Sequence, residues 1–365
     1  MQPYGIQSDS HCHNWHAFSS ILESGINNRL QHILDEKIRL ANEVKKVGGN
    51  TIYHTGDLFH VRGNIAPSVL NPTLDTYRHI VKEMGMKVRI LAGNHDLEGR
   101  DAHRVSSAIT ALEGIGCEIV NAPTAFYDDQ VIMLPWHQNT DDLKKAIADM
   151  VKGLAEHEDE CARINDIHNW DLMIHAPVDG VIPGLPAHGL TDKELVDFGF
   201  KRVFCGHYHH HKDFGNGVYS VGASTHQTWS DVGSKAGFLI VDSLDVKWYR
   251  SHAPEFVEIN GDMDELEMKA VVDGAYVRAK INSDKAADVE AVRNFLLESG
   301  AKGVTILTTK VAIEASRSTS TVKAGASIEA SVGEFIKSSP GVTDAEALTK
   351  LCNSILVEAR MEVAE

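Results

Sequence analysis

The chain has 365 residues, a formal net charge of −16 and 43% hydrophobic residues. This length predicts two domains with an appendage, and the apolar fraction is sufficient for a packed core. No apolar run approaches the ~20 residues of a membrane-spanning helix, and the N-terminus lacks the pattern of a secretory signal. Five cysteines without a CxxC pair fit a reducing compartment, so we expect a cytoplasmic protein with no membrane association.

Residues 1–255 alternate between short apolar strands and amphipathic helices, which is typical of an α/β fold. Helices are predicted over 20–48, 67–85, 101–114 and 141–160. Strands at 118–121, 124–127 and 130–134 are expected to form an antiparallel unit, and those at 217–222, 236–242 and 245–250 to form hairpins at a sheet edge. Together with the apolar runs considered below, this pattern predicts two sheets flanked by helices.

The character of the sequence changes after residue 255. An acidic run over 262–267 has the composition of a linker, and a strand, a helix and a strand follow over 274–309. Residues 313–326 are rich in Ser, Thr, Ala and Gly and predict a flexible tether. Two helices are predicted within 327–365. The apolar stripe of the second helix either packs on the chain's own core or binds a partner protein; it consists of Ala347, Leu348, Leu351, Ile355, Leu356 and Met361.

Five polar segments each follow a short apolar or β-rich run. They are Asp9-Ser10-His11, Gly56-Asp57, Gly93-Asn94-His95-Asp96, His175 and Gly206-His207-Tyr208-His209. Because α/β proteins place their chemistry in loops at the carboxyl ends of strands, these segments are expected to meet at one rim. Glycines before the second, third and fifth sets of ligands allow the sharp turns that such a rim requires.

The five segments offer two aspartates, one asparagine and four histidines as ligands. A centre for two metal ions in a phosphoesterase needs this mixture, with one carboxylate shared between the ions. Carboxylate and amide oxygens combined with imidazoles suit Mn or another octahedral first-row metal, with Mg, Fe or Zn as alternatives, and exclude an all-thiolate zinc cage.

With these motifs the chain resembles the calcineurin-like metallophosphoesterases, and within them the SbcD-type double-strand-break nucleases, particularly the phage recombination endonuclease subunits. The narrower resemblance depends on Gly56-Asp57-Leu58-Phe59-His60-Val61-Arg62, on Leu134-Pro135-Trp136 and on Ser220-Val221-Gly222-Ala223-Ser224. Asp9-Ser10-His11-Cys12-His13 departs from the Asp-x-His-Leu-Gly usual in these nucleases. The resemblance implies a nuclease domain over 1–255, a small β-α-β capping domain over 256–312 and a helical partner-binding segment over 327–365.

The resemblance also implies a role for each site residue. One metal would be held by Asp9, His11, Asp57 and His209, and the other by Asp57, Asn94, His175 and His207, so that Asp57 bridges. His95 would protonate the leaving sugar oxygen, a role that suits imidazole near neutral pH. Asp96 would hold the tautomer of His95, His60 would be a second imidazole near the substrate, and Arg62 would bind a flanking phosphate.

The resemblance implies an Mn-dependent exonuclease and endonuclease that acts on DNA ends with an SbcC-type ATPase, in the host cytoplasm if phage-encoded. The charge of −16 opposes simple binding to nucleic acid, but cationic metals and a partner subunit would offset it. A stand-alone phosphodiesterase for small phosphodiesters or cyclic nucleotides is the alternative enzyme. A binding scaffold would require degraded ligands, and all of them are present.

Two further expectations concern assembly and the remaining histidines. Helices 67–85 and 101–114 are placed where the similar nucleases form a two-fold dimer, with Val69, Leu70, Leu74, Ile80 and Val81 as apolar surface or as ordinary core packing. By strand alternation, His209 and not His210 or His211 points inward with His207. His13 and His16 are expected outside the set of ligands, and His226 is expected in the substrate groove.

Overall fold

The computed structural model describes residues 2–97, 108–156, 166–259, 263–282, 286–308, 327–339 and 344–362. The chain forms two compact units, which are described separately. The first comprises Met1–Ile281 with Ala286–Leu307, and the second comprises Asn282–Lys285 with Thr308–Glu365. The expected tether, residues 313–326, lies outside the described residues.

The first unit contains two six-stranded mixed sheets, which confirms the predicted two-sheet α/β fold. The first sheet has the order β12-β11-β1-β2-β3-β4, with β1 to β4 parallel and β11 and β12 antiparallel at one side. Its strands are β1 (Tyr4–Gln7), β2 (Thr51–His54), β3 (Lys87–Leu91), β4 (Glu118–Val120), β11 (Gly237–Val241) and β12 (Val246–Arg250).

The second sheet has the order β5-β6-β7-β8-β10-β9. Strands β6, β7, β8 and β10 are parallel, and β5 and β9 pair antiparallel at the two edges. Its strands are β5 (Thr124–Phe126), β6 (Val131–Leu134), β7 (Asp171–His175), β8 (Arg202–Gly206), β9 (Lys212–Asp213) and β10 (Val218–Ser220).

The core has three layers, one between the two sheets and one between each sheet and its helices. Alternating residues of each strand point into different layers. Met133 and Met173 point into the core between the two sheets, where they pack with Tyr4 and Leu91 of the first sheet. Their neighbours on the other face, such as Leu172, pack instead under the helices of the second sheet. Since residues i and i+2 of a strand share a face, this alternation makes both faces of each sheet apolar and buries them.

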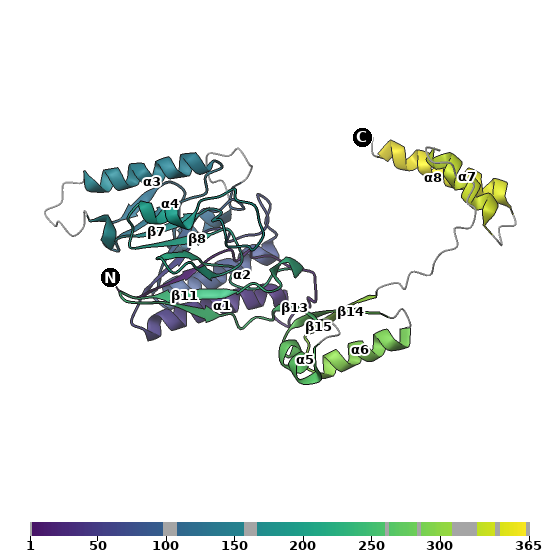
Figure 1. The fold of residues 1–365 in the computed structure, drawn as a ribbon, viewed down its shortest axis with the longest axis horizontal. Helices are drawn as coiled ribbons and strands as arrows, with labels where there is room; N and C mark the ends of the chain where they lie inside the picture. Colours follow the sequence, from purple (N-terminus) through teal and green to yellow (C-terminus); the bar gives the residue numbers. More distant parts are fainter. Residues whose placement is uncertain are drawn as a thin grey trace. The chain divides into compact units, whose positions relative to one another are not determined.

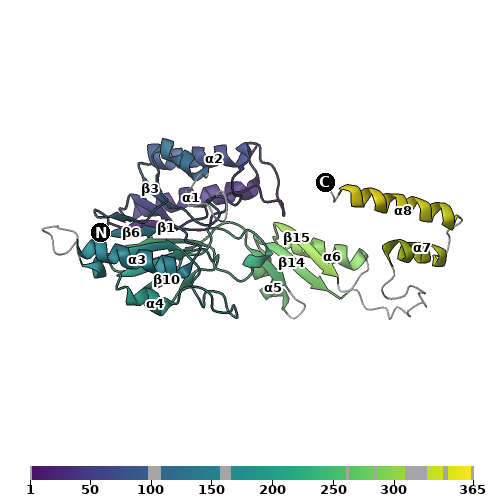
Figure 2. The same ribbon diagram turned by 90° about the horizontal axis from the view of Figure 1, so that it is seen from above.

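Helices cover the two outer faces (Figures 1 and 2). The first sheet is covered by α1 (Asn28–Lys46) and α2 (Pro67–Arg78), which continues as the π-helix His79–Glu83, while the 3-10 helix Ala108–Ile115 joins the same core. The second sheet is covered by α3 (Thr140–Ala155) and α4 (Asp192–Asp197). None of the described helices is long and apolar enough to cross a membrane.

Several expected elements differ in their bounds or pairing. The first helix begins at Asn28 and not at residue 20, because the side chain of Asn27 accepts from Arg29 N and Leu30 N and caps the helix there. The antiparallel unit predicted over 118–134 is wrong in part, since β4 pairs in parallel with β3 in the first sheet and only β5 and β6 pair antiparallel in the second. Residues 101–107 of the predicted third helix lie outside the described residues.

The segment after residue 255 forms a third sheet in the order β13-β14-β15. Its elements are β13 (Phe256–Ile259), α5 (Glu265–Val272), β14 (Tyr276–Ile281), α6 (Ala286–Glu298) and β15 (Gly303–Thr308). The predicted strand, helix and strand are confirmed. The acidic run was wrongly expected to be a linker, because Asp264 accepts from Leu266 N and Glu267 N and starts α5.

The second unit is a pair of helices, α7 (Ile328–Ser338) and α8 (Ala345–Glu362). Ser327 caps α7 by accepting from Ala330 N. Within the stripe predicted on α8, Leu348, Leu351 and Ile355 are exposed. Within the second unit taken by itself, these three side chains are not covered by α7.

Candidate metal centre

The predicted ligands lie at the carboxyl ends of strands from both sheets. Asp9, Asp57 and Asn94 follow β1, β2 and β3 of the first sheet, whereas His175 ends β7 and His207 follows β8 of the second. Backbone bonds connect these loops, with Asp9 N donating to Gly56 O at 3.0 Å and His11 N donating to Asp57 O at 3.0 Å. Segments far apart in the sequence thus meet at one rim, as the strand pattern predicts.

The carboxylate of Asp57 lies between imidazoles contributed by the two sheets. Its Oδ2 is 3.6 Å from His11 Nε2 and 3.5 Å from His175 Nε2. Its Oδ1 accepts from His95 N at 2.8 Å, which fixes the rotation of the carboxylate. Asp57 is also buried, at 2% exposure. This is the position that a ligand shared between two ions would occupy.

On one side of Asp57, the ligand atoms of Asp9, His11 and His209 all lie within 4.8 Å of one another. His209 Nδ1 is 2.7 Å from Asp231 Oδ1, which leaves Nε2 as the atom that faces the group. A carboxylate that orients an imidazole in this way is a common second layer around protein-bound metals.

On the other side, Asn94 Oδ1 lies 3.0 Å from His175 Nε2 and 3.1 Å from His207 Nδ1. His175 Nδ1 donates to Thr55 O at 2.7 Å, so its Nε2 is the atom available as a ligand. Asp9, Asp57 and His175 also have ligand atoms within 4.8 Å of one another. The two groups together have the oxygen and nitrogen donors that a pair of divalent cations requires.

The backbone around the ligands is held in conformations that are unfavourable for most residues. Asp9, His11, Asp57 and His207 have φ values of 44°, 43°, 56° and 107°. Only two other non-glycine residues in the described part of the chain have positive φ. Because such conformations cost free energy and persist only when the surroundings enforce them, their concentration here marks a functional site.

The glycines beside the ligands are required by close packing. A Cβ at Gly93 would overlap the carboxylate of Asp57, and one at Gly56 would overlap the ring of His175. Gly56 also has a φ of 106°, which only glycine adopts readily. The predicted need for glycine at these turns is confirmed.

Burial and mutual charge shift the pKa values of the ligands in opposite directions. Burial alone would raise the pKa of Asp57, but His175 and His11 hold it well below its usual range. Burial likewise opposes protonation of His175, yet Asp57 raises the pKa of His175 to about 9. Burial lowers the pKa of His207 to about 3 and that of His11 well below its usual range. The centre therefore pairs an ionised Asp57 with neutral His11 and His207, whereas contacts with Asp57 and Asp231 raise the pKa values of His175 and His209. A cation that binds His175 would displace its proton.

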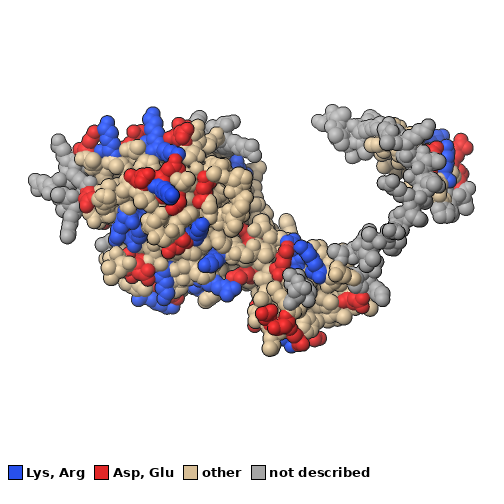
Figure 3. All heavy atoms as spheres, viewed as in Figure 1, with Lys and Arg blue, Asp and Glu red and all other residues tan. Residues whose placement is uncertain are grey.

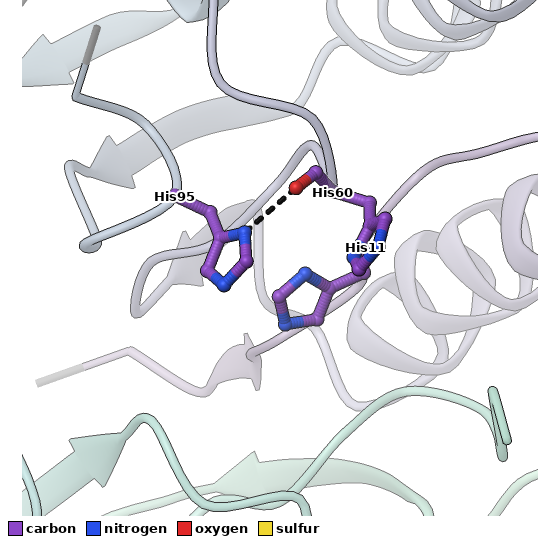
Figure 4. Close-up of side chains that lie close together, drawn as sticks. All are labelled: His11, His60 and His95. Atoms are coloured by element: carbon purple, nitrogen blue, oxygen red, sulfur yellow. Dashed lines mark hydrogen bonds between the residues drawn. The ribbon is translucent and has the colours of Figure 1, made fainter. Parts of the chain in front are cut away.

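His95 and His60 lie beside His11 (Figure 4). His95 Nδ1 lies 2.6 Å from the carbonyl oxygen of His60, and its ring centroid is 4.8 Å from that of His11. The His60 ring stacks on His95 at 5.5 Å, and burial lowers the pKa of His60 to about 4. Arg62 is half-buried in the bend after His60.

The expected role of Asp96 is not the one that the structure supports. Its Oδ2 accepts from Gly93 N and Asp57 N, both at 2.9 Å, and the tautomer of His95 is set instead by the carbonyl of His60. The short spacing in Gly93-Asn94-His95-Asp96 turns the Asp96 side chain back onto the loop. Asp96 thus ties the loops after β2 and β3 together.

The other histidines are placed outside the set of ligands. His13 contacts the His60 ring at 5.1 Å, and His16 is exposed. His211 Nδ1 donates to Ser220 O at 2.8 Å. His226, which was expected in the substrate groove, is instead buried. Its Nδ1 accepts from Phe256 N at 2.9 Å, and this bond holds the start of β13.

Two residues of the site were not anticipated. Asp231, which orients His209, lies in a short 3-10 turn, and a Thr228–Asp231 capping pattern was its only signal. Trp136 belongs to the Leu134-Pro135-Trp136 motif, which gives no sign of a place in the site, but its ring stacks on that of His207 with 5.1 Å between ring centroids. Its ring contacts the metal centre from the loop after β6.

No protein-family model and no curated protein matches this chain. Among solved structures, the chain is similar to a dimetal phosphatase from Danio rerio, with 10% sequence identity and a TM-score of 0.38. The match covers 68% of this chain and 96% of the phosphatase.

Proposed function

We propose that this chain is a phosphodiesterase that uses two divalent cations, preferably Mn²⁺, and cuts DNA at its ends. The proposal is based mainly on the position of Asp57 Oδ2. This atom lies within 3.6 Å of His11 Nε2, from the first sheet, and of His175 Nε2, from the second. Further oxygen and nitrogen donors lie on both sides of it. A shared carboxylate with mixed ligands on each side is what a two-metal phosphoesterase requires.

Asp9, His11 and His209 would hold one cation, and Asn94, His175 and His207 the other, with Asp57 shared. When bound, such cations neutralise charge on the phosphate and lower the pKa of an attacking water molecule. The fixed loops keep the donors in place before the cations bind, so little ordering is needed on binding.

His95 would transfer a proton to the leaving oxygen. Its Nδ1 is held by the carbonyl of His60, so Nε2 is the atom that can exchange a proton with the substrate. Its backbone N–H is held by Asp57, which keeps the imidazole beside the centre. Arg62, in the bend after His60, would bind a neighbouring phosphate of the same strand.

Charge distribution favours a second candidate, a stand-alone enzyme for small phosphodiesters. The chain has a net charge of −16, and on the face drawn in Figure 3 the described acidic and basic residues are interspersed, without a continuous basic band. DNA binding normally requires such a band. The nuclease proposal therefore includes a partner that supplies cationic surface.

The test is to load the purified chain with Mn²⁺ and compare linear duplex DNA with a chromogenic phosphodiester. We expect hydrolysis of both, and loss of both in Asp57→Asn, which also controls for contaminating nucleases. Hydrolysis of the small ester alone, both by the chain and by the chain with its ATPase partner and ATP added, would refute the nuclease proposal and favour the second candidate.

The partner would be an SbcC-type ATPase that binds the helical segment 327–365. The exposed Leu351 and Ile355 of α8 support this, since an apolar helix face suits binding in a groove. Deletion of 327–365 should leave hydrolysis of the small ester intact and abolish ATP-stimulated cutting of DNA. A truncated chain that still co-purifies with the ATPase would refute this location.

A homodimer also remains part of the proposal, and light scattering would test it. The apolar residues expected to form its surface are largely used within the chain, because Val69 and Ile80 are 2% and 1% exposed in the core beneath α2. Leu70, Leu74 and Val81 pack partly against the same core. A dimer would therefore need other contacts of this helix.

A further inference from the structure

A pocket of about 470 Å³ opens beside His207 and His209 of the metal centre. His207 and His209 form its inner wall, Ile182 and Pro183 lie on one side, and Val232 lies in the turn that forms another. Its size is within the range of ligand-binding pockets in proteins. His11, His60 and His95 do not line it, so the pocket is separate from the proposed proton donor.

The loop that carries Ile182 is ordered by its own hydrogen bonds. Val178 and Leu190 form a bridge at its base. Asp179 Oδ1 accepts from His188 N at 3.0 Å and from Gly189 N at 2.9 Å. Lys212 Nζ donates to Gly180 O at 2.6 Å. This bonding presents Ile182, which is 39% exposed, on a fixed support.

An aromatic side chain lies between the loop and the metal centre. The OH group of Tyr208 is 3.0 Å from His188 Nε2, which fixes the phenol ring. The same ring is 5.2 Å from the His207 ring. Because a fixed aromatic ring costs little entropy when a flat ligand stacks on it, Tyr208 is suited to contact an aromatic group.

The residues that line the pocket also indicate that it does not bind a phosphate group. Among the described residues, it contains no Lys or Arg, and its one carboxylate, Asp231, is bonded to His209. A second phosphate would find no cationic partner there. Ser230, Ser234 and His210 supply neutral polar groups at the edge.

From these features we infer that the pocket holds the nucleoside attached to the scissile phosphate, on the side that does not leave. The inference rests on the proposed function. The leaving group lies near His95, so the retained nucleoside is the part of the substrate that extends past His207 and His209. Its base contacts Ile182, Val232 and Tyr208, and these contacts bind the substrate in a pocket whose described lining contains no Lys or Arg.

The test compares two esters with the same leaving group, thymidine 5′-(p-nitrophenyl) phosphate and methyl p-nitrophenyl phosphate. The bond broken is the same in both, and only the retained group differs. The Mn²⁺-loaded chain should prefer the thymidine ester by ~10-fold or more in kcat/KM, as expected for one stacked base. Ile182→Ser should reduce this preference several-fold, and Val232→Trp should remove it by filling the pocket.

Leu185→Ser is the matched control, because Leu185 lies on the same loop, is 44% exposed and does not line the pocket. It should keep the preference of the unmodified chain. Thermal unfolding would show whether each variant folds. If Val232→Trp fails to fold, the result with Ile182→Ser alone tests the pocket. Equal use of the two esters, or a preference that survives in Ile182→Ser, refutes the pocket while leaving the phosphodiesterase proposal standing. Hydrolysis of neither ester refutes both.

Discussion

The two sheets contribute different chemistry to one centre. The first sheet supplies both carboxylates, the amide and one imidazole, from loops in which Asp9, His11 and Asp57 have positive φ. The second sheet supplies imidazoles alone, and its His175 is still a regular strand residue in register with Gly206. The boundary between the two sheets is called the seam below. The ligand carboxylates and most of the backbone strain thus lie on the side of the first sheet, while most of the imidazole nitrogen donors lie on the side of the second.

The centre is complete only when the two sheets pack together. Asp57 of the first sheet lies within reach of His175 of the second, and Asn94 lies beside His175 and His207. A buried bond also joins the sheets, since Tyr4 OH donates to Asp171 Oδ2 at 2.6 Å. Binding of cations should therefore stabilise the packing of the sheets as well as the loops.

Replacing the shared ligand should have the largest effect. Asp57→Ala removes the carboxylate between the sheets, and the loss of several kcal/mol of charge stabilisation corresponds to ~10³-fold or more in rate. Bound Mn²⁺, measured by mass spectrometry of the desalted chain, should also fall. Asp128→Ala, at an exposed position, is the control and should change neither. Full metal content in Asp57→Ala would contradict the shared position.

His95→Ala should separate proton transfer from metal binding. The rate should fall by ~10²–10⁴-fold, as is usual for loss of a general acid, while both cations remain bound. Rates with a p-nitrophenol leaving group should suffer less, because that group needs little protonation. If metal is lost instead, the division between ligands and proton donor is wrong.

Asp231→Asn tests whether the carboxylate that orients His209 contributes to metal binding. Asp231 orients His209 through the 2.7 Å contact, and loss of such a partner typically weakens metal binding by ~10–100-fold. We expect one of the two binding steps to weaken in calorimetric titration with Mn²⁺. The exposed Asp197→Asn is the matched control. Equal weakening of both steps would mean that the two sites are not separable.

The smallest effect concerns protons. In the metal-free chain the pKa of His175 is raised to about 9, so His175 adds stability that is present below its unfolded value and lost as pH rises through about 9. Metal binding near pH 7 must then release this proton, and affinity should rise with pH by at most ~10-fold per unit. Titrations in buffers of different ionisation enthalpy would measure the release, which should decrease in His175→Asn.

The sequence predicted the strands, the loops after them and the glycines, because these depend on local pattern. It also placed the ligands of both sheets at one rim, since parallel strands share an edge. It could not assign β4 to its sheet, because that depends on where the chain crosses between layers. Asp231 and the carbonyl of His60 were missed for a related reason, as each acts on a residue that only the tertiary fold brings near.

The most direct test of the seam is electron paramagnetic resonance of the Mn²⁺-loaded chain together with its metal content. A shared carboxylate holds two ions within ~4 Å, as in other two-metal sites. The account predicts two Mn²⁺ per chain with an exchange-coupled spectrum. A folded chain that binds a single Mn²⁺, or two with uncoupled spectra, would contradict a centre shared between the sheets.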